Sequence, residues 1–195
     1  MISSKLIKKA FYLNKFEPDF KSILKNLKIG SYSSMNQTHS NKVLFTDLGN
    51  EYNCDSLITR QKNHALLVKT ADCMPILLND GIHVGAVHSG WRGVDNEIFE
   101  NTLKNFEIKN LKVSIGPHAQ SCCYEIQNDV YQRLGEFVKI KEKKYYLKLS
   151  NKIQKLSEKY LFKLEISKYC TVCDKNYFSY RENGTSERQY SLIWQ

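Results

Sequence analysis

The amino-acid sequence predicts an α/β fold in a single domain with a β-rich core. The chain has 195 residues, of which 42% are hydrophobic and 25% charged, and these values are typical of one globular domain. Short apolar segments separated by turn residues crowd the region from 43 to 88, which is the pattern of strands. Beyond residue 94, apolar residues recur at helical spacing in three segments.

The first half of the chain predicts mostly strands. Residues 1–30 are rich in lysine and have apolar residues at mixed spacing, which indicates a strand followed by a short amphipathic helix. The strands expected next span residues 43–45, 56–59, 64–70, 75–78 and 82–88. Residues 79–81, with the sequence Asn-Asp-Gly, form the turn between the last two.

The second half alternates helices and strands. Residues 95–106 predict a helix with Asp95 as its N-cap, so that residues 90–93 connect a strand to this helix. The other helices are expected at residues 128–137 and 150–162, and the other strands at residues 111–115, 177–180 and 189–194. Residues 139–148 are interpreted as a charged connection.

Composition excludes several classes of function. The net charge is +9, but 24 of the 29 basic residues are lysines spread over the chain, whereas base readout and bidentate phosphate contacts favour arginine. We therefore expect no nucleic-acid partner. No apolar run is long enough to span a bilayer, and no apolar segment of a signal peptide follows the N-terminus. The chain is predicted to be cytoplasmic, without a membrane partner.

The six cysteines do not predict a disulfide framework, because cytosolic thiols are kept reduced. Cys170 and Cys173 have the spacing of a redox or zinc-knuckle motif, but a structural zinc site needs a second pair, and Cys122 and Cys123 are adjacent rather than spaced. We favour buried structural thiols for these cysteines over a metal or redox role.

Three separated residues, His39, Cys73 and His88, have side chains of the metal-ligand type. Imidazole and thiolate select zinc or copper, and three protein ligands with one open position describe a catalytic zinc site. Cys73 lies between two apolar strands and His88 ends a strand, so both could face the same edge of one sheet.

Six short sequence motifs, which include the three candidate ligands, follow one another from about residue 36 to the C-terminus. They comprise residues 37–39 with Val43, 55–59, 71–75, 88–93, 115–117 with 123–126, and 170–171 with 178–181. In this set the chain resembles the YfiH-type purine nucleoside phosphorylases, also known as multicopper polyphenol oxidases or laccase-domain proteins. The resemblance implies a single α/β/β/α sandwich with mixed β-sheets over residues 1–195, with a shortened N-terminal part.

The resemblance also implies a site and an activity. Zinc, or copper in its place, would be bound by His39, Cys73 and His88, with purine nucleosides and phosphate beside it. The implied activities are phosphorolysis of adenosine, inosine, guanosine and methylthioadenosine, and deamination of adenosine. Gln37 is implied as a substrate-binding residue, and a role in editing peptidoglycan precursors is also attached to bacterial members.

Candidate catalytic and substrate-binding residues surround the proposed ligands. Asp72, next to Cys73, is either an acid/base group or a residue that orients the loop. Arg92 is a candidate phosphate ligand at the start of the predicted helix, and its alternative role is to pair with a carboxylate or to stack on Trp91. Arg181 and Arg188 are further candidates for anion binding.

Departures from the family pattern leave some roles open. The N-terminal loop of the family has no counterpart, and Glu187 replaces a small residue near the C-terminus. His118 stands where the family often has cysteine, and is interpreted as a polar loop residue or as an alternative ligand.

Two rivals to the phosphorylase hypothesis follow. A laccase binds several coppers through many histidines, often in His-x-His pairs, whereas this chain has five histidines and no such pair. The laccase hypothesis therefore remains only as a single copper bound by His39, Cys73 and His88. The second rival is a binding or editing protein without turnover. The complete ligand set favours a zinc-dependent purine nucleoside phosphorylase with adenosine deaminase activity.

Overall fold

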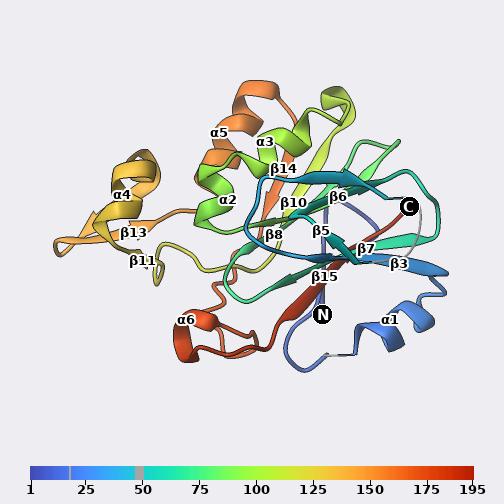
Figure 1. Cartoon of the computed structure of the whole chain (residues 1–195), viewed down its shortest axis with the longest axis horizontal. Coiled ribbons are helices and arrows are strands. Elements are labelled where there is room, and N and C mark those ends of the chain that lie inside the picture. The colour runs from blue at the N-terminus through green and yellow to red at the C-terminus, as the bar shows by residue number, and fades with distance from the viewer. Residues whose placement is uncertain (18, 47–50) are drawn as a thin grey trace.

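Two six-stranded sheets pack face to face between outer layers of helices in the computed structural model, which describes residues 1–17, 19–46 and 51–195 (Figure 1). The first sheet has the strand order β1-β2-β15-β7-β3-β5. Its strands are β1 (Ile2–Ser3), β2 (Ala10–Tyr12), β15 (Gln189–Ile193), β7 (His64–Thr70), β3 (Ser31–Asn36) and β5 (Glu51–Asn53). Parallel pairing joins β3 to β5 and β7, and the other pairs are antiparallel.

The second sheet has the strand order β14-β10-β8-β9-β6-β4. Its strands are β14 (Lys163–Ile166), β10 (Lys112–Ile115), β8 (Met74–Asn79), β9 (Val84–Ser89), β6 (Ser56–Thr59) and β4 (Val43–Phe45). The edge strands β14 and β4 pair in parallel with their neighbours, and the central strands are antiparallel. Both sheets are therefore mixed, as the family resemblance implies.

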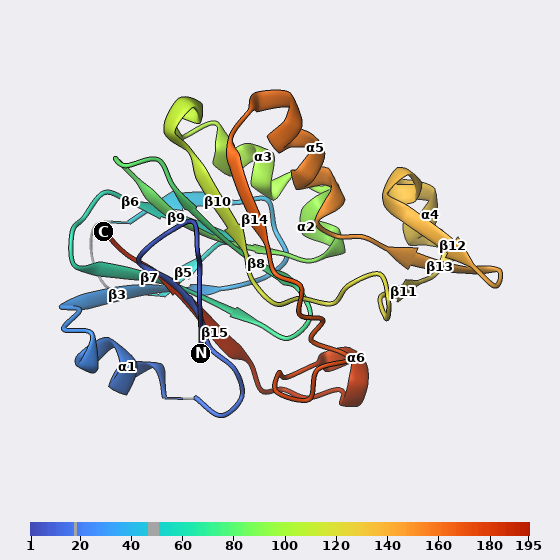
Figure 2. The same ribbon diagram turned by 180° about the vertical axis from the view of Figure 1, so that it is seen from behind.

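Helices cover the outer face of each sheet and complete an α/β/β/α sandwich. Helix α1 (Phe20–Asn26) packs on the first sheet, while α2 (Trp91–Asp95), α3 (Ile98–Leu103) and α5 (Asn151–Tyr160) cover the second (Figures 1 and 2). The hydrophobic residues form three clusters: one under α1, one between the sheets and one under the helices of the second sheet. The predicted fold class is confirmed.

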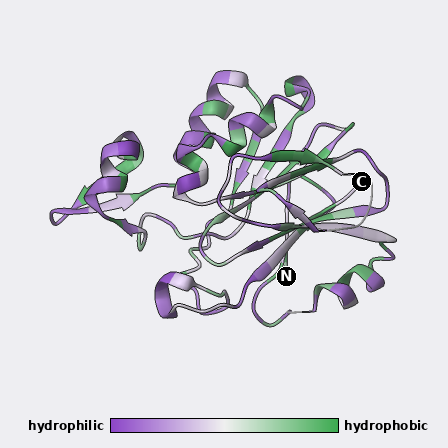
Figure 3. Ribbon diagram, viewed as in Figure 1, coloured by the Kyte–Doolittle hydropathy of each residue, from purple (hydrophilic) through white to green (hydrophobic). Residues whose placement is uncertain are grey.

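Burial on both faces explains the continuous apolar segments of the central strands. In β7, Ala65 and Leu67 point toward α1, while Leu66 and Val68 point between the sheets. In β8, Leu77 joins the cluster between the sheets, and its neighbours on either side lie under the helices. Figure 3 shows hydrophobic residues along these central strands and mostly hydrophilic residues on α6 (Tyr180–Asn183).

A small three-stranded sheet stands apart at one end of the molecule (Figures 1 and 2). It consists of β11 (Glu125–Ile126), β12 (Val138–Lys141) and β13 (Lys144–Leu147), with α4 (Asn128–Leu134) beside it. The prediction of a charged connection at residues 139–148 is wrong, because these residues form the β12–β13 hairpin. Three lysines in the hairpin strands are solvated, which hides the strand pattern in the sequence.

Two further element predictions are also wrong. The single helix expected at residues 95–106 is divided into α2 and α3, because Glu97 adopts a left-handed conformation with φ 62°. Asp95 ends α2 and is not the N-cap of a helix. The strand expected at residues 177–180 is absent from the described structure, where Ser179 instead caps α6 by accepting a hydrogen bond from the backbone N–H of Glu182. Strands β3, β5 and β14 were not predicted.

In the residues described, the helices are too short or too polar for any of them to cross a membrane.

Candidate metal and substrate site

The three predicted ligands meet at one end of the sandwich, where the chain passes between the sheets. His39 lies in the loop from β3 of the first sheet to β4 of the second, and Cys73 lies in the loop from β7 to β8, which makes the same crossing. His88 is on β9, paired with Pro75 at the start of β8. Their ligand atoms lie within 4.8 Å of one another, so the structure brings the predicted set together.

Asp55 is the residue that holds two of the three ligands in place. Its carboxylate accepts hydrogen bonds from the backbone N–H groups of Thr38, His39 and Ser40, at 3.2, 3.1 and 2.7 Å. It also accepts a hydrogen bond from Nδ1 of His88 at 2.8 Å. Because this bond keeps a proton on Nδ1, Nε2 is the nitrogen that can bind a metal, which would take the place of its proton.

The backbone around the ligands is shaped for close approach. His39 adopts φ 60°, a left-handed conformation that non-glycine residues rarely take, and its Nε2 lies 3.8 Å from Sγ of Cys73. A Cβ added to Gly90 would lie 2.6 Å from that sulfur, inside any ordinary contact distance. Glycine is needed at the N-cap of α2 because a side chain there would collide with the thiolate. The backbone conformation does not require glycine, since φ is −87°.

The three ligands perturb one another's ionisation. Burial by itself raises the pKa of Cys73, but the imidazoles of His88 and His39 outweigh burial and lower the pKa to about 6. Burial by itself lowers the pKa of His88, but the Cys73 thiolate and Asp55 outweigh burial and raise the pKa to about 9. For Asp55, hydrogen bonds from His88 and Ser40 overcome the effect of burial and hold the pKa at about 2.

These observations fit a metal ion of the kind that the sequence predicts. A thiolate at neutral pH, a histidine oriented by a carboxylate and a second histidine provide soft and borderline donors, as zinc and copper prefer. The three donors leave a coordination position for a further ligand. The arrangement could therefore hold a metal and present it to a small molecule.

Asp72 supports the loop that carries Cys73. Its carboxylate accepts hydrogen bonds from Oγ1 of Thr171 and from the backbone N–H of Arg181, both at 2.7 Å, and its carbonyl accepts one from the N–H of Ala119 at 2.9 Å. Asp72 is buried and has φ 89°, so these contacts hold a strained residue beside a ligand. The contacts favour the loop-holding role over the acid/base role.

Arg181 and Tyr124 contact each other beside the loop that carries Asp72 and Cys73. The guanidinium of Arg181 lies 4.0 Å from the ring centroid of Tyr124 and donates a hydrogen bond to the carbonyl of Glu125 at 2.6 Å. Burial and then the charge of Cys73 raise the pKa of Tyr124 to about 12, so its hydroxyl stays protonated at neutral pH. This pair combines an exposed cation with a neutral hydroxyl.

Arg92 lies at the first turn of α2, next to the crowded Gly90. Its guanidinium stacks on Trp91, 4.5 Å from the ring centroid, which is one of the two roles predicted for it. The side chain is exposed, and no carboxylate in the described part of the chain forms an ion pair with it. Stacking therefore leaves the donors of the guanidinium accessible to an anion.

The remaining predicted residues lie in other contacts. The side-chain amide of Gln37 donates to the carbonyl of Lys69 at 2.7 Å and accepts from its N–H at 2.9 Å. Arg188 donates to the carbonyls of Thr185 and Glu187 within its own loop. His118 is buried, with Nδ1 2.8 Å from the carbonyl of Gly116, and it is not among the residues whose ligand atoms converge.

Two residues of the site were not singled out by sequence reasoning. Asp55 and Tyr124 fall within the motif segments, but no role was predicted for either of them. Its place at the start of the motif segment 55–59, directly before strand β6, is the signal that could have identified Asp55. Asp55 accepts hydrogen bonds from a loop 15 to 17 residues earlier in the chain, and only the folded structure reveals these contacts.

The chain is similar to proteins with several names. The family model described as multi-copper polyphenol oxidoreductase laccase matches residues 17–195. A protein of Aquifex aeolicus named purine nucleoside phosphorylase is 32% identical over 143 residues, which cover 71% of the chain and 69% of that protein. One of Borreliella burgdorferi with the same name is 35% identical, with coverage of 72% and 68%. A third, from Clostridium acetobutylicum, is 35% identical, with coverage of 82% and 75%.

Solved structures show the same fold. A Neisseria meningitidis protein of the DUF152 type superposes with a TM-score of 0.81 at 23% identity, covering 99% of the chain and 89% of that structure. The YfiH protein of Bacillus licheniformis gives a TM-score of 0.80 at 24% identity, with coverage of 89% and 78%. These likenesses concern the arrangement of the two sheets and their helices.

Proposed function

The chain belongs to the multi-copper polyphenol oxidoreductase laccase family, the YfiH-type family of its sequence motifs, and on this premise we propose that it is a metal-dependent purine nucleoside phosphorylase. The observation that carries the proposal is the convergence of His39, Cys73 and His88 in a chain whose curated relatives are named purine nucleoside phosphorylase. We further propose zinc as the metal, and adenosine, inosine, guanosine and methylthioadenosine as substrates.

Phosphorolysis requires that a phosphate be held against C1′ of the ribose while positive charge develops on the sugar and the purine leaves. A bound metal would supply Lewis acidity and a point of attachment for an anionic or polar ligand. Guanidinium groups bind phosphate in bidentate fashion, so we propose Arg92, two residues after Gly90, and Arg181, whose N–H donates to Asp72, as the phosphate-binding residues. Arg188 is the weaker candidate, because its donors bind carbonyls of its own loop.

The surrounding residues have separable roles in this proposal. Asp55 orients His88 and the loop of His39, and Asp72 holds the loop of Cys73. Tyr124 offers a protonated hydroxyl that can bind a hydroxyl or a ring nitrogen of a nucleoside. We propose that the two aspartates position the metal ligands and that Tyr124 positions the substrate, while the arginines neutralise the phosphate.

Deamination of adenosine is a second proposed activity of the same site. It requires a water rather than a phosphate as the nucleophile, together with a group that moves a proton. The sequence predicts Asp72 for that step, but both of its oxygens are already hydrogen-bonded. We therefore expect deamination to be slower than phosphorolysis in this chain.

Product analysis with adenosine tests both activities. The chain is purified without added metal, its zinc and copper are measured, and adenosine is supplied with and without phosphate. Adenine and ribose 1-phosphate that appear only with phosphate support phosphorolysis, whereas inosine supports deamination. If zinc-replete protein yields neither adenine nor inosine, both proposals are contradicted. Copper content with oxidation of a phenol would support the oxidase alternative, and binding without turnover would support the editing or binding alternative.

Matched variants locate the activity. Cys73→Ala is expected to abolish turnover, and Cys54→Ala serves as its control, because Cys54 is a buried thiol outside the site. Arg181→Ala is expected to raise KM for phosphate more than KM for the nucleoside. Arg133→Ala, which removes an exposed arginine of α4, is the control for charge. Full activity of Cys73→Ala would refute the proposed site.

A further inference from the structure

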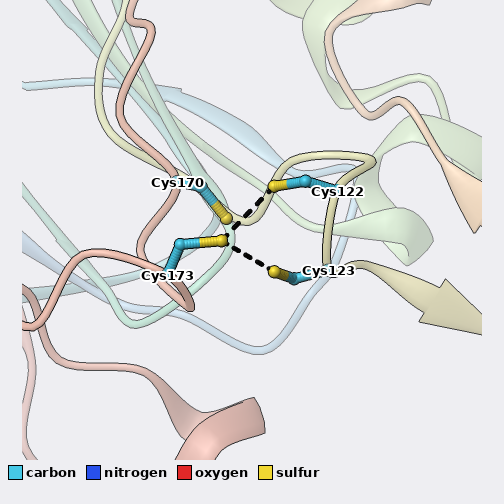
Figure 4. A group of neighbouring side chains, drawn as sticks. All are labelled: Cys122, Cys123, Cys170 and Cys173. Carbon is cyan, nitrogen blue, oxygen red and sulfur yellow. Dashed lines mark hydrogen bonds between the residues drawn. The ribbon is translucent and has the colours of Figure 1, made fainter.

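The remaining cysteines form a second cluster outside the site described above. The adjacent pair Cys122 and Cys123 lies in the turn between β10 and β11, and Cys170 and Cys173 lie in the segment between β14 and α6. Figure 4 shows all four sulfurs pointing toward a common centre. Their sulfur atoms lie within 4.8 Å of one another. The expectation of buried thiols is wrong for Cys122 and Cys173, because both residues are exposed.

We propose that these four cysteines bind a structural zinc ion. Tetrahedral zinc with Zn–S bonds of about 2.3 Å separates its sulfurs by about 3.8 Å. Sγ of Cys173 lies 2.8 Å from Sγ of Cys123 and 3.5 Å from Sγ of Cys122, so binding needs only small shifts in side-chain torsions. Cys122 and Cys123, about 50 residues before Cys170 and Cys173, supply the second pair that a structural zinc site needs.

The backbone around the cluster is arranged as in a zinc knuckle. Cys170 and Cys173 are separated by two residues in a turn in which the N–H of Asp174 donates to the carbonyl of Cys170 at 2.9 Å. Sγ of Cys170 accepts a hydrogen bond from the N–H of Gln120 at 3.4 Å. Backbone N–H groups aimed at a sulfur stabilise a thiolate, which is the form that binds metal.

The two segments are fixed to each other independently of any metal. His118 and Cys170 form a parallel bridge, in which the N–H of Thr171 donates to the carbonyl of His118 at 3.2 Å. The side chain of Gln120 donates to the carbonyl of Ser167 at 2.9 Å. Because the backbone prearranges both pairs, zinc would not have to order the loops that bind it.

The charge and spacing of the cluster select the occupant. Four thiolates close together repel one another unless a cation lies among them. Of the two lysines that line the same surface hollow, Lys175 is paired with Glu182, so the thiolates need a bound cation. An iron–sulfur cluster would separate the thiolates by its own iron and sulfide atoms, whereas these sulfurs surround a single centre. Four protein sulfurs fill a tetrahedral site, so the ion is structural and has no open position.

This zinc would stabilise the candidate active site through Asp72. Ala119 and Thr171, which each lie within three residues of a cluster cysteine, donate hydrogen bonds to the carbonyl and to the carboxylate of Asp72. Asp72 precedes Cys73 directly. Zinc at the cysteine cluster would therefore add a further link between two segments that already bind the loop of the other site through hydrogen bonds.

Metal analysis of the 195-residue chain without a histidine tag tests the proposal. The wild type is expected to contain zinc at both sites, and Cys173→Ser to lose one zinc ion per chain. Cys54→Ser is the control and should keep the wild-type zinc content. Equal zinc in the wild type and Cys173→Ser would overturn the proposal, as would iron in place of zinc. An intact-mass loss of two hydrogens for each disulfide among these cysteines in the wild type would also overturn it.

Cobalt reconstitution keeps the test decisive if Cys173→Ser does not fold. Cys73→Ala removes the thiolate of the other site and leaves the four clustered cysteines intact. We expect this variant to bind one Co²⁺ with intense thiolate-to-cobalt charge-transfer absorption and the visible bands of a tetrahedral complex. Absence of that absorption from folded Cys73→Ala would refute the four-cysteine site, whatever the nucleoside activity of the wild type.

Discussion

At the scale of single residues, the candidate metal site depends on a carboxylate that touches no substrate. Asp55 binds three consecutive N–H groups of the loop that carries His39, and it binds His88 as well. A carboxylate with this many donors is stabilised in its charged form, which explains why its pKa lies at about 2. The ligands therefore meet in fixed orientations before any metal arrives.

Asp55→Asn tests this role. The amide keeps the size of the side chain but loses the charge and one acceptor oxygen, so His88 and the loop of His39 lose orientation. We expect zinc affinity at this site to fall roughly 10- to 100-fold, the usual effect of removing a group that orients a metal ligand. Zinc affinity is measured by competition with a chromophoric chelator in a Cys173→Ser background.

Asp80→Asn is the matched control, because Asp80 is also buried and binds the N–H groups of Ile82 and His83, away from the site. Equal zinc affinity of the Asp55 and Asp80 variants would show that Asp55 does not orient the ligands.

Gly90→Ala tests the space beside Cys73. The new Cβ would lie 2.6 Å from Sγ, so the thiolate must move out of its ligand position. We expect loss of metal binding at this site with the fold retained, because φ is −87° at this residue and alanine is not strained there. Gly135→Ala is the control: its φ is −54°, and its Cβ would meet nothing closer than 3.4 Å. Metal content and circular dichroism of both variants decide the matter, and wild-type metal content in Gly90→Ala contradicts the steric argument.

At the scale of elements, side chains extend the strand pairing toward the site. Parallel pairing of β3 with β7 ends near Ser33 and Leu66, and β3 itself ends at Asn36. The amide of Gln37 then pairs with the N–H and the carbonyl of Lys69, as a strand residue would. Because His39 follows two residues later, this pairing directs the loop back across the sandwich.

Gln37→Ala separates this role from the substrate contact that the family resemblance implies. Loss of the paired amide is expected to lower the free energy of unfolding by about 1 kcal/mol and to weaken metal binding. Gln132→Ala, at an exposed position on α4, should change stability by less than about 0.5 kcal/mol. Urea unfolding and nucleoside kinetics are compared. Unchanged stability with a raised KM would instead identify Gln37 as a substrate contact.

The strands, helices and site residues of this chain differ in how well the sequence predicts them. Strands β6 and β7 match their predicted bounds, because both of their faces are buried and their apolar segments are continuous. The break between α2 and α3 escaped prediction, since it depends on the left-handed Glu97, and glutamate carries no signal for that conformation. The ligand set was predicted from motifs, whereas the cysteine cluster joins segments about 50 residues apart that only the fold brings together.

At the scale of the whole molecule, the site depends on how the two sheets are held together. The loops of His39 and Cys73 both cross from one sheet to the other. Besides the apolar layer, polar contacts join the sheets: the hydroxyl of Tyr12 on β2 donates to Ser114 on β10 at 2.8 to 2.9 Å. A Cβ on Gly116 would meet the ring of Tyr12 at 2.2 Å, so this approach requires glycine. Sheet packing and ligand geometry are therefore coupled.

Glu165 on β14 ties the N-terminal segment to the second sheet and makes stability depend on pH. Its carboxylate accepts hydrogen bonds from the hydroxyls of Ser4 and Ser114 and from the N–H of Lys5 at 3.0 Å. Burial raises the pKa of Glu165, but these hydrogen bonds outweigh burial and lower it. With a folded pKa below the unfolded value, the contribution to stability is full above that unfolded value, about 4.5, and is lost as the pH falls through the folded pKa.

Glu165→Gln removes this charge, and its effect should itself depend on pH. The amide loses one acceptor oxygen facing the donors, so we expect the variant to be less stable than the wild type at pH 7 by roughly 1 to 2 kcal/mol, the range for hydrogen bonds to a charged group. The difference should shrink as the pH falls below about 4.5, where protonation removes the charge from the wild type as well. Glu158→Gln, at an exposed position on α5, is the control and should follow the wild type at every pH. Urea unfolding from pH 7 to pH 3 measures the three curves, and a difference that is constant over this range would show that the ionisation of Glu165 does not hold the sheets together.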